Sequence, residues 1–194
     1  MNLPNYGSLQ PTESKVAALW AVEQIKILKS RYFQAVDEKD YGTVAVLFTA
    51  DAVVDFSGEP EHHIGHHGVT AGEIDPDSWR VIGGTEAGRV IATAVRNVVT
   101  VHQGHDPQIV ITGPTTARGR WTLYDMLEFP DETMHGFGHY LEEYELHDGE
   151  WLISSLRLTR LRVAWAPTLP SMHLAADGAP RRAHGQHDRM ITGP

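Results

Sequence analysis

Three stretches late in the chain decide the fold: ARGRWTLYDMLEF at residues 117–129, HGFGHYLEEYELH at residues 135–147 and WLISSLRLTRLRVA at residues 151–164. Each stretch is long and rich in Val, Ile, Leu, Tyr and Trp, which are residues that β-strands favour. The links between them are short, and the second link contains the turn sequence HDG at residues 147–149. The three stretches therefore predict consecutive strands of one antiparallel sheet.

The predicted sheet extends toward the N-terminus. Residues 98–102 and 108–112 predict two further strand segments, and residues 52–58 form an apolar strand candidate closed by glycine. Glycines inside a strand commonly mark bends or bulges. The sheet is therefore predicted to curve strongly, at the strand glycines Gly104, Gly119, Gly136 and Gly138.

Helical periodicity is found in the first half of the chain. In residues 12–39 apolar side chains recur at spacings of three and four, the pattern of a helix with one apolar face. Residues 42–48 and 85–95 predict two shorter helices, and residues 59–84, rich in Gly, His, Pro and Asp, predict a long loop. Helices first and strands last indicate an α+β class with a largely antiparallel sheet. A bent sheet with helices across its open side makes a cone with one internal cavity.

A chain of 194 residues fits one ordinary domain with additional segments at its ends. We expect an N-terminal arm at residues 1–11, a single domain at residues 12–165 and a C-terminal tail at residues 166–194. The tail contains prolines, glycines and little apolar material. We therefore expect it to be disordered or to lie over a neighbouring subunit.

The composition excludes several classes of function. The formal net charge of −9 argues against a nucleic-acid partner, which calls for a basic face, and against an anionic membrane surface. The lack of cysteine excludes disulfides, thiolate nucleophiles and thiolate metal sites. No apolar stretch is long enough to span a bilayer, and the polar N-terminus contains no visible secretory signal. We expect a cytoplasmic protein that binds neither nucleic acid nor membrane.

A tyrosine, an aspartate and a histidine form the candidate catalytic set. Tyr32 and Asp37 lie near the end of the first predicted helix, and His102 lies at the end of a predicted strand. An acid that orients an imidazole, with a phenol that donates a proton, is a general acid–base set that needs no metal or cofactor. A carboxylate bonded to one ring nitrogen fixes the tautomer and makes the other nitrogen a better base.

Each candidate also has a purely structural interpretation. Asp37 can be an exposed acid at a helix end, and Tyr32 can be a core aromatic residue whose hydroxyl bonds to the backbone. Arg160 is a cation in an otherwise apolar strand. It can bind a carboxylate or an enolate oxygen, or it can form a surface salt bridge.

Four histidines form a dense cluster in the predicted loop. Their spacing is one that metal sites use. However, no predicted helix or strand fixes their geometry, so adventitious metal pickup is the favoured interpretation and we expect no metal site. The cluster consists of His62, His63, His66 and His67.

Several segments, taken in order, resemble the SnoaL-like branch of the NTF2-like superfamily. The chain is especially similar to the bile acid 7α-dehydratase group, and more distantly to scytalone dehydratase and hexachlorocyclohexane dehydrochlorinase. The segments run in register from about residue 16 to 164 and are IKILKSRYFQAVD (25–37), VHQGHDPQI (101–109), TTARGRW (115–121), YLEEY (140–144), DGEW (148–151) and LTR (158–160).

The resemblance implies a cone-shaped α+β barrel in which the residues matching Tyr32, Asp37, His102 and Arg160 line the cavity and serve catalysis. It also implies activity without a cofactor and a homo-oligomer, either a trimer or a dimer. One position departs from the pattern, because Phe56 stands where the bile acid enzyme has a further pocket tyrosine. This difference argues for another substrate.

We therefore expect a cofactor-independent lyase, a dehydratase that acts on a hydrophobic carbonyl compound such as a steroid, terpenoid or polyketide. In this hypothesis His102, oriented by Asp37, takes the proton, and Tyr32 or Arg160 stabilises the enolate. An isomerase or polyketide cyclase can use the same site, because the fold alone does not fix the activity. A non-catalytic binding or assembly module is a further alternative, and it predicts a filled cavity or a His102 distant from Asp37. The candidate wall residues are Phe56, Trp121, His139 and Tyr140.

Overall fold

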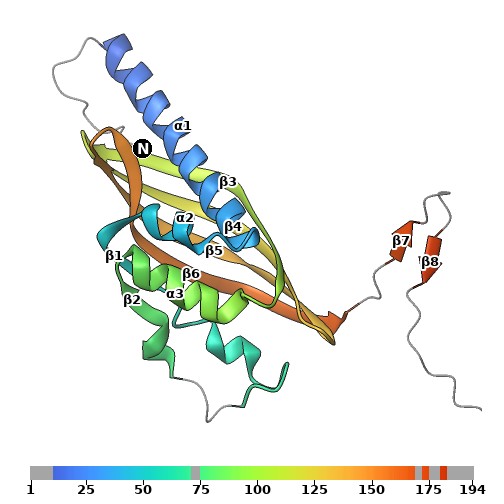
Figure 1. Ribbon diagram of the computed structural model, residues 1–194. Helices are drawn as coiled ribbons and strands as arrows, with labels where there is room; N and C mark the ends of the chain where they lie inside the picture. The colour runs from blue at the N-terminus through green and yellow to red at the C-terminus, as the bar shows by residue number, and fades with distance from the viewer. Residues whose placement is uncertain (1–10, 71–74, 169–171, 175–179, 183–194) are drawn as a thin grey trace, which may run out of the picture.

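The three late stretches form neighbouring strands of a curved, six-stranded sheet (Figure 1). They are β4 (Thr116–Glu128), β5 (Glu132–His147) and β6 (Glu150–Pro167). The sheet order is β2-β1-β6-β5-β4-β3, and the strands from β3 to β6 pair antiparallel in chain order, as predicted. The computed structural model describes residues 11–70, 75–168, 172–174 and 180–182.

The other three strands complete the two sides of the sheet. β3 (Val99–Gly113) is one long strand rather than two segments, with a register shift between His105 and Gln108. β1 (Phe48–Asp55) pairs parallel with β6 and antiparallel with β2 (Arg80–Ile82). β1 begins and ends earlier than the predicted strand at 52–58, because its pairing with β6, and not its apolar run, sets its limits.

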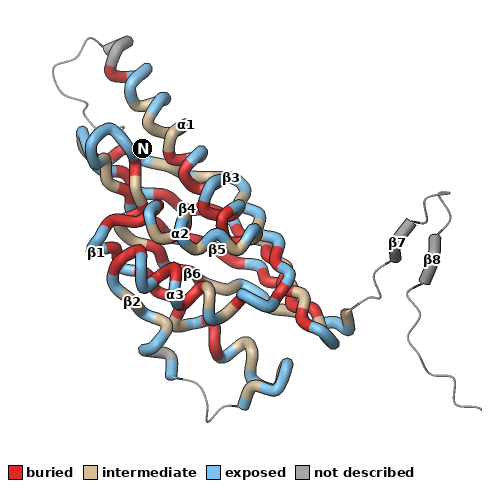
Figure 2. The backbone as a smooth tube through the Cα atoms, in the orientation of Figure 1, coloured by how far each residue is buried: buried red, intermediate tan, exposed pale blue. Residues whose placement is uncertain are grey.

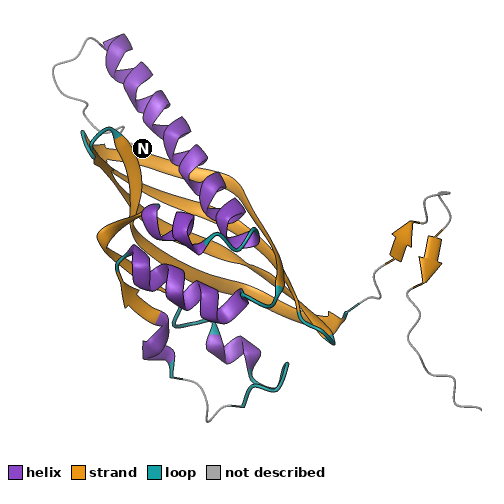
Figure 3. Cartoon of the chain, viewed as in Figure 1, coloured by secondary structure: helices purple, strands orange, loops and turns teal. Residues whose placement is uncertain are grey.

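Three helices pack against one face of this sheet (Figures 1 and 3). α1 (Pro11–Asp37) runs along β3 and also contacts β6. α2 (Tyr41–Val46) and α3 (Gly84–Val95) pack against each other beside β1. The predicted α+β cone with a mostly antiparallel sheet is confirmed.

The hydrophobic core lies between the helices and the sheet (Figure 2). Ile25 and Leu28 of α1 and Leu123, Ile153 and Leu156 of the sheet belong to it, and each is at most 4% exposed. Burying one such side chain stabilises the fold by roughly 1.5–3 kcal/mol. Alternate residues of each central strand face this core, so the inward side chains define one enclosed space.

The segment between β1 and α3 is more ordered than the predicted loop. Its described residues include the 3-10 helices η1 (Pro60–His63) and η3 (Pro76–Trp79), in addition to β2. The backbone N–H of Phe56 donates to the carbonyl of Trp79 at 2.9 Å, which joins the two ends of the segment. Such order comes from contacts distant in the sequence, which local glycine and proline content does not reveal.

Both predicted end segments lie largely outside the described residues. Residues 1–10 of the predicted arm are outside them, and Pro11 already belongs to α1. In the predicted tail, β7 (Met172–Leu174) and β8 (Pro180–Arg182) pair antiparallel, which the sequence did not predict. Among the described helices, none combines the length and the hydropathy needed to cross a membrane.

Candidate functional site

The C-terminal end of α1 brings Asp37 to the sheet. Beyond it, the N–H of Asp40 donates to the carbonyl of Ala35 at 2.8 Å and the N–H of Lys39 donates to that of Val36 at 3.2 Å, with a φ of 64° at Lys39. These bonds form a Schellman-type cap, which ends the helix sharply. A carboxylate in the last helical turn meets the negative end of the helix dipole, so Asp37 needs donors from another element.

Strand β3 supplies those donors. The Nδ1 atom of His102 lies 2.6 Å from Oδ1 of Asp37, and the backbone N–H of His102 donates to Oδ2 at 2.9 Å. The Thr100 hydroxyl donates to Oδ1 at 2.8 Å and accepts a bond from Nζ of Lys39, also at 2.8 Å. The predicted contact between Asp37 and His102 is therefore present, and a side-chain and a backbone bond together fix its geometry.

These bonds also determine the charge of Asp37. Burial acts to raise the pKa of Asp37, but the hydrogen bonds from the His102 ring and backbone, the charge of His102 and the Thr100 hydroxyl together lower it below its usual value. Asp37 is therefore an ionised acceptor at neutral pH. Nδ1 of His102 then carries the proton that points to Asp37, and Nε2 is the nitrogen that can act as a base.

The imidazole of His102 is held from its face as well as from its edge. It stacks on the ring of Phe33, with centroids 6.2 Å apart and an interplanar angle of 10°. Phe33 can approach because β3 has Gly104 here; a Cβ at this position would lie 2.5 Å from the Phe33 ring. The His102 side chain is only 9% exposed. Its orientation is thus set by packing before any ligand binds.

A cavity of about 360 Å³ lies beside this pair. His102 is part of its wall, whereas Asp37, which was also expected there, borders a separate groove between α1 and β3. A mostly apolar hollow with a few convergent polar groups is the usual form of a small-molecule site. The apolar part of the wall includes Val36, Phe56, Val90, Ile91, Ala94, Val95, Leu127, Phe129 and Leu158.

Two tyrosines are among the polar residues that line the cavity. Tyr32 and Tyr140 both line it, both are 2% exposed, and their rings meet edge to face with centroids 6.1 Å apart. Burial raises the pKa of Tyr32, and so does the charge of Glu142. Burial is also the main cause of the raised pKa of Tyr140. Both phenols therefore remain protonated at neutral pH and can donate a hydrogen bond.

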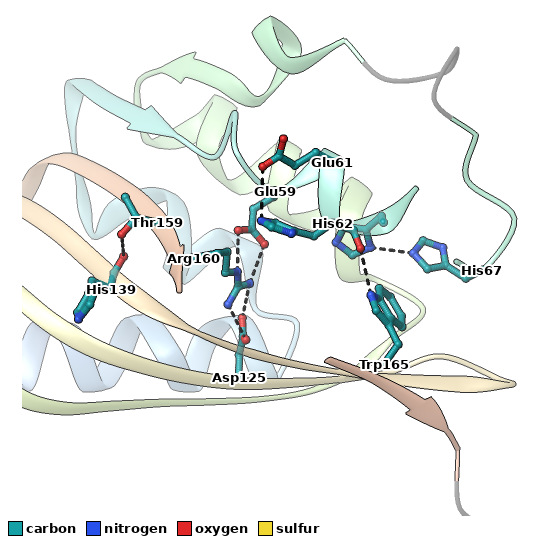
Figure 4. Close-up of polar contacts among 10 residues, drawn as sticks. Glu59, Glu61, His62, His67, Asp125, His139, Thr159, Arg160 and Trp165 are labelled. Atoms are coloured by element: carbon teal, nitrogen blue, oxygen red, sulfur yellow. Dashed lines mark hydrogen bonds and ion pairs between the residues drawn. The ribbon is translucent and has the colours of Figure 1, made fainter. Parts of the chain in front are cut away.

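Arg160 lies at the cavity wall between two carboxylates (Figure 4). It donates to both oxygens of Glu59 at 2.8 and 2.6 Å, and to both oxygens of Asp125 at 2.8 Å. Burial acts to lower the pKa of Arg160, and the two carboxylates outweigh it and raise it. The interpretation as a surface salt bridge is wrong, because the Arg160 side chain is 4% exposed. The expected open anion site is not seen either, because Glu59 and Asp125 occupy the guanidinium.

Sequence reasoning missed both partners of Arg160. Asp125 lies between Leu123 and Leu127 on the inward face of β4. A charged residue at a core position was therefore the signal that could have revealed it. Glu59 follows β1 in the predicted loop and had no such signal. Gly136 makes room for the cluster, since a Cβ there would collide with Asp125 and Arg160.

The four candidate wall residues divide into two groups. Phe56 and Tyr140 line the cavity. Trp121 instead borders a separate groove between α1 and β3, and its Nε1 donates to the Tyr144 hydroxyl at 2.8 Å. His139 was predicted wrongly: it forms a bond with Arg120 at 2.9 Å, does not line the cavity and points away from Arg160 (Figure 4). Adjacent strand residues face opposite sides, so Tyr140 inside requires His139 outside.

A second buried ion pair also escaped the sequence analysis. Nζ of Lys29 bonds to Glu142, and the other oxygen of Glu142 accepts the Tyr144 hydroxyl. Nζ also lies 3.5 Å from the ring centroid of Tyr140. Burial lowers the pKa of Lys29 to about 8, although Glu142 opposes the shift. Neighbouring aromatic rings thus enclose this pair directly behind the cavity.

The histidine cluster packs on aromatic rings. His66 stacks on Trp165 at 4.2 Å, and His67 stacks on Phe129 at 4.1 Å. Nδ1 of His63 lies 2.8 Å from Nε2 of His67, and Trp165 donates to the carbonyl of His62 at 3.0 Å. No group of three or more potential ligands with metal-site geometry occurs in the described part of the chain. The cluster instead fastens the segment after β1 to the end of β6.

A family model described as the SnoaL-like domain matches residues 17–157. This range includes both members of the Asp37–His102 pair and both carboxylates bound to the cavity arginine. The match covers most of the chain and ends just before Leu158 and Arg160 of β6, which also line the cavity.

Solved structures share the fold at low sequence identity. A protein named as a candidate scytalone dehydratase from Novosphingobium aromaticivorans has a TM-score of 0.61 and 15% identity, with 75% of this chain and 87% of that chain covered. A hexachlorocyclohexane dehydrochlorinase from Novosphingobium barchaimii has a TM-score of 0.60 and 18% identity, with 79% and 94% covered. A candidate aromatic ring hydroxylase from Novosphingobium aromaticivorans has a TM-score of 0.58 and 22% identity, with 75% and 91% covered. These likenesses extend to the fold, and the activities named for the three proteins differ.

Proposed function

The chain belongs to the SnoaL-like domain family, and from this premise we propose that it is a cofactor-independent lyase, a dehydratase of hydrophobic carbonyl compounds. The observation that carries the proposal is the 2.6 Å contact between Nδ1 of His102 and Asp37 at the wall of an apolar cavity. A binding module with a filled cavity, or with these two groups apart, would not have this geometry.

The reaction begins with transfer of a proton from carbon to Nε2 of His102. The proton comes from the carbon next to the substrate carbonyl or from its vinylogous position, and the C–H electron pair moves into the enolate. When the enolate collapses, the C–O bond breaks at the hydroxyl on the carbon next to the one that lost its proton, and the proton held by His102 leaves with that oxygen as water. Asp37 keeps the ring in one tautomer and stabilises the imidazolium formed between these steps.

The enolate oxygen requires a hydrogen-bond donor. Tyr32 and Tyr140 line the same cavity as His102, and both keep their protons at neutral pH. A positioned donor of this kind contributes roughly 3–4 kcal/mol to transition-state stabilisation. In this proposal the tyrosines bind the oxygen, whereas Arg160 holds Glu59 and Asp125 in place.

The cavity limits the class of substrate. A steroid, terpenoid or polyketide fragment fits an apolar wall, and the volume of about 360 Å³ favours a compact skeleton over an extended conjugate. Phe56 contributes carbon where a tyrosine would offer a hydroxyl. Self-association as a trimer or dimer and a cytoplasmic location remain predictions from the sequence.

An isomerase or cyclase would use the same base and the same donors. In that case the abstracted proton returns to another atom of the substrate and no group leaves. Mass spectrometry separates the alternatives, because the lyase product lacks one water whereas the isomerase product keeps the mass of the substrate.

The test is turnover of a panel of neutral β-hydroxy ketones with steroid, terpenoid and polyketide skeletons by wild type, His102→Gln and His105→Gln. His105 is an exposed histidine on the same strand and serves as the matched control. We expect His102→Gln to lose about 100-fold or more in kcat/KM, the usual contribution of a general base. His105→Gln should retain its rate. A His102→Gln variant that kept most of its activity would refute the proposed role of His102.

A further inference from the structure

Carboxylates outnumber cations at the cavity wall. Within the described residues that line the cavity, Arg160 is the only lysine or arginine, whereas Glu59, Asp75 and Asp125 are acidic. His63 also lines the cavity, and burial, assisted by the charge of His67, lowers its pKa to about 4, so it is neutral at pH 7. Arg160 is therefore the one permanently charged cation among the described residues that line this cavity.

The guanidinium of Arg160 is already nearly saturated. A guanidinium has five N–H donors, and four hydrogen bonds run from Arg160 to Glu59 and Asp125. The two acids are 7% and 2% exposed, respectively. A carboxylate ligand could bind Arg160 only by displacing one of them, and a buried charge without its partner is costly.

We infer that Glu59 and Asp125, by capping Arg160, make this cavity select uncharged carbonyl compounds against carboxylates of the same shape. The inference rests on the proposed function for the assumption that this cavity is the substrate site. Both acids make two-point pairs, Asp125 at the Nη1 and Nη2 edge and Glu59 at the Nε and Nη2 edge of the guanidinium. Glu59 is the acid to remove, because it is the more exposed of the two and lies in the segment after β1, whereas Asp125 lies in the central strand β4.

Removing Glu59 should therefore create an anion site instead of merely weakening the cavity. In Glu59→Ala the Arg160 edge is free while Asp125 continues to hold the opposite side. Glu61 provides the matched control, because it lies two residues further along the same segment, is 73% exposed and pairs with His62 instead of Arg160 (Figure 4). Glu61→Ala removes the same charge from the protein and leaves the cap intact.

The experiment measures binding of two fluorescent probes with one naphthalene skeleton. The neutral probe is 6-propionyl-2-dimethylaminonaphthalene, and the anionic probe is 6-dimethylamino-2-naphthoate, both titrated at pH 7.5 into wild type, Glu59→Ala, Glu59→Gln and Glu61→Ala. We expect wild type to bind the ketone at least about 10-fold more tightly than the carboxylate, since an unpaired buried charge is strongly disfavoured. Glu59→Ala should reverse that ratio, Glu59→Gln should shift it in the same direction, and Glu61→Ala should match wild type.

Three results would overturn the inference: equal binding of both probes by wild type, equal effects of Glu59→Ala and Glu61→Ala, or no binding of the ketone by wild type. If Glu59→Ala fails to fold, judged by circular dichroism, the isosteric Glu59→Gln decides the outcome. The titrations are repeated in His102→Gln, which keeps the cap. Selective binding by a protein without dehydratase activity would leave this inference standing while the proposed function failed.

Discussion

Two ion pairs tie α1 to the sheet, and their surroundings are opposite. Lys29 and Glu142 are completely buried, with no exposed surface on either side chain. Asp37 and His102 keep 25% and 9% of their side-chain surface, and His102 also borders the cavity. The first pair is enclosed by aromatic rings, so its charges interact only with the protein. The second pair keeps one nitrogen available, which makes it suited to chemistry. Contact with the cavity, rather than the degree of burial alone, therefore distinguishes a pair suited to catalysis from a structural pair.

The largest expected effect is on stability, at the enclosed pair. Glu142→Gln leaves the Lys29 ammonium buried without a counter-charge, and breaking a buried pair in this way costs about 3–5 kcal/mol of unfolding free energy. Chemical denaturation measures the loss. Glu143→Gln changes the neighbouring, exposed residue and should stay within about 0.5 kcal/mol of wild type. Equal losses in the two variants would contradict the structural role of the Lys29–Glu142 pair.

The next effect is on rate, at the open pair. Asp37→Asn removes the charge that orients His102, and we expect kcat/KM to fall by about 100-fold, equivalent to about 2.7 kcal/mol in activation free energy. The unfolding free energy should change much less than in Glu142→Gln. Glu38→Gln, at the next position on the chain, should leave the rate unchanged. The comparison fails if Asp37→Asn affects stability alone.

A glycine-to-alanine substitution near each pair should have a smaller effect on stability, and its effect on kcat should differ between the two pairs. In Gly119→Ala the new Cβ would lie 2.8 Å from the Tyr144 hydroxyl, which bonds to Glu142. In Gly104→Ala it would press on Phe33, on which His102 stacks. Overpacking of this kind costs about 1–3 kcal/mol in either variant. Only Gly104→Ala should also lower kcat, and a loss of kcat in the properly folded Gly119→Ala variant would break the distinction.

The smallest effect is a difference in pH dependence. Folding lowers the pKa of Asp37 below 3.8, so the ionised carboxylate stabilises the folded state at neutral pH. As pH falls below about 4, the unfolded state takes up this proton before the folded state does, and the stabilisation is lost. Folding lowers the pKa of Lys29 from 10.5 to about 8, so the folded state loses this proton before the unfolded state does. The stability of the fold therefore rises as pH increases from about 8 to 10.5. Unfolding of wild type, Asp37→Asn and Lys29→Met across pH measures both. Wild type and Asp37→Asn should converge at acid pH, and wild type should gain on Lys29→Met at alkaline pH. The opposite slopes would refute the assignment.

Local sequence patterns predicted the elements more accurately than their environments. The three long strands and the three helices were found because alternation and helical spacing are local properties. The limits of β1 and the order in residues 59–84 were missed because pairing with β6 and aromatic packing on Trp165 set them. His139 was misplaced by neglect of alternation, since Tyr140 beside it already occupied the inner face.

The candidate site was predictable in part for the same reason. A carboxylate at a helix end and a histidine at a strand could be paired as a hypothesis, because an inward acid requires a partner. The partners of Arg160 could not be found in this way. Asp125 and Glu59 come from β4 and from the segment after β1, and they meet at one guanidinium only in the folded chain, where Gly136 leaves room for Asp125 and Arg160.

Sequence patterns were sufficient to predict the α+β class, the order of helices and strands, the curved sheet and the pairing hypothesis for Asp37 and His102. The folded structure was needed to show which charges are enclosed, which face the cavity and that Arg160 is already occupied. The cause is the range of the interactions. Helical spacing and strand alternation depend on residues close together in the sequence, so the sequence alone reveals helices and strands. Desolvation and ion pairing depend on residues such as Lys29 and Glu142, 113 positions apart, that meet only after folding.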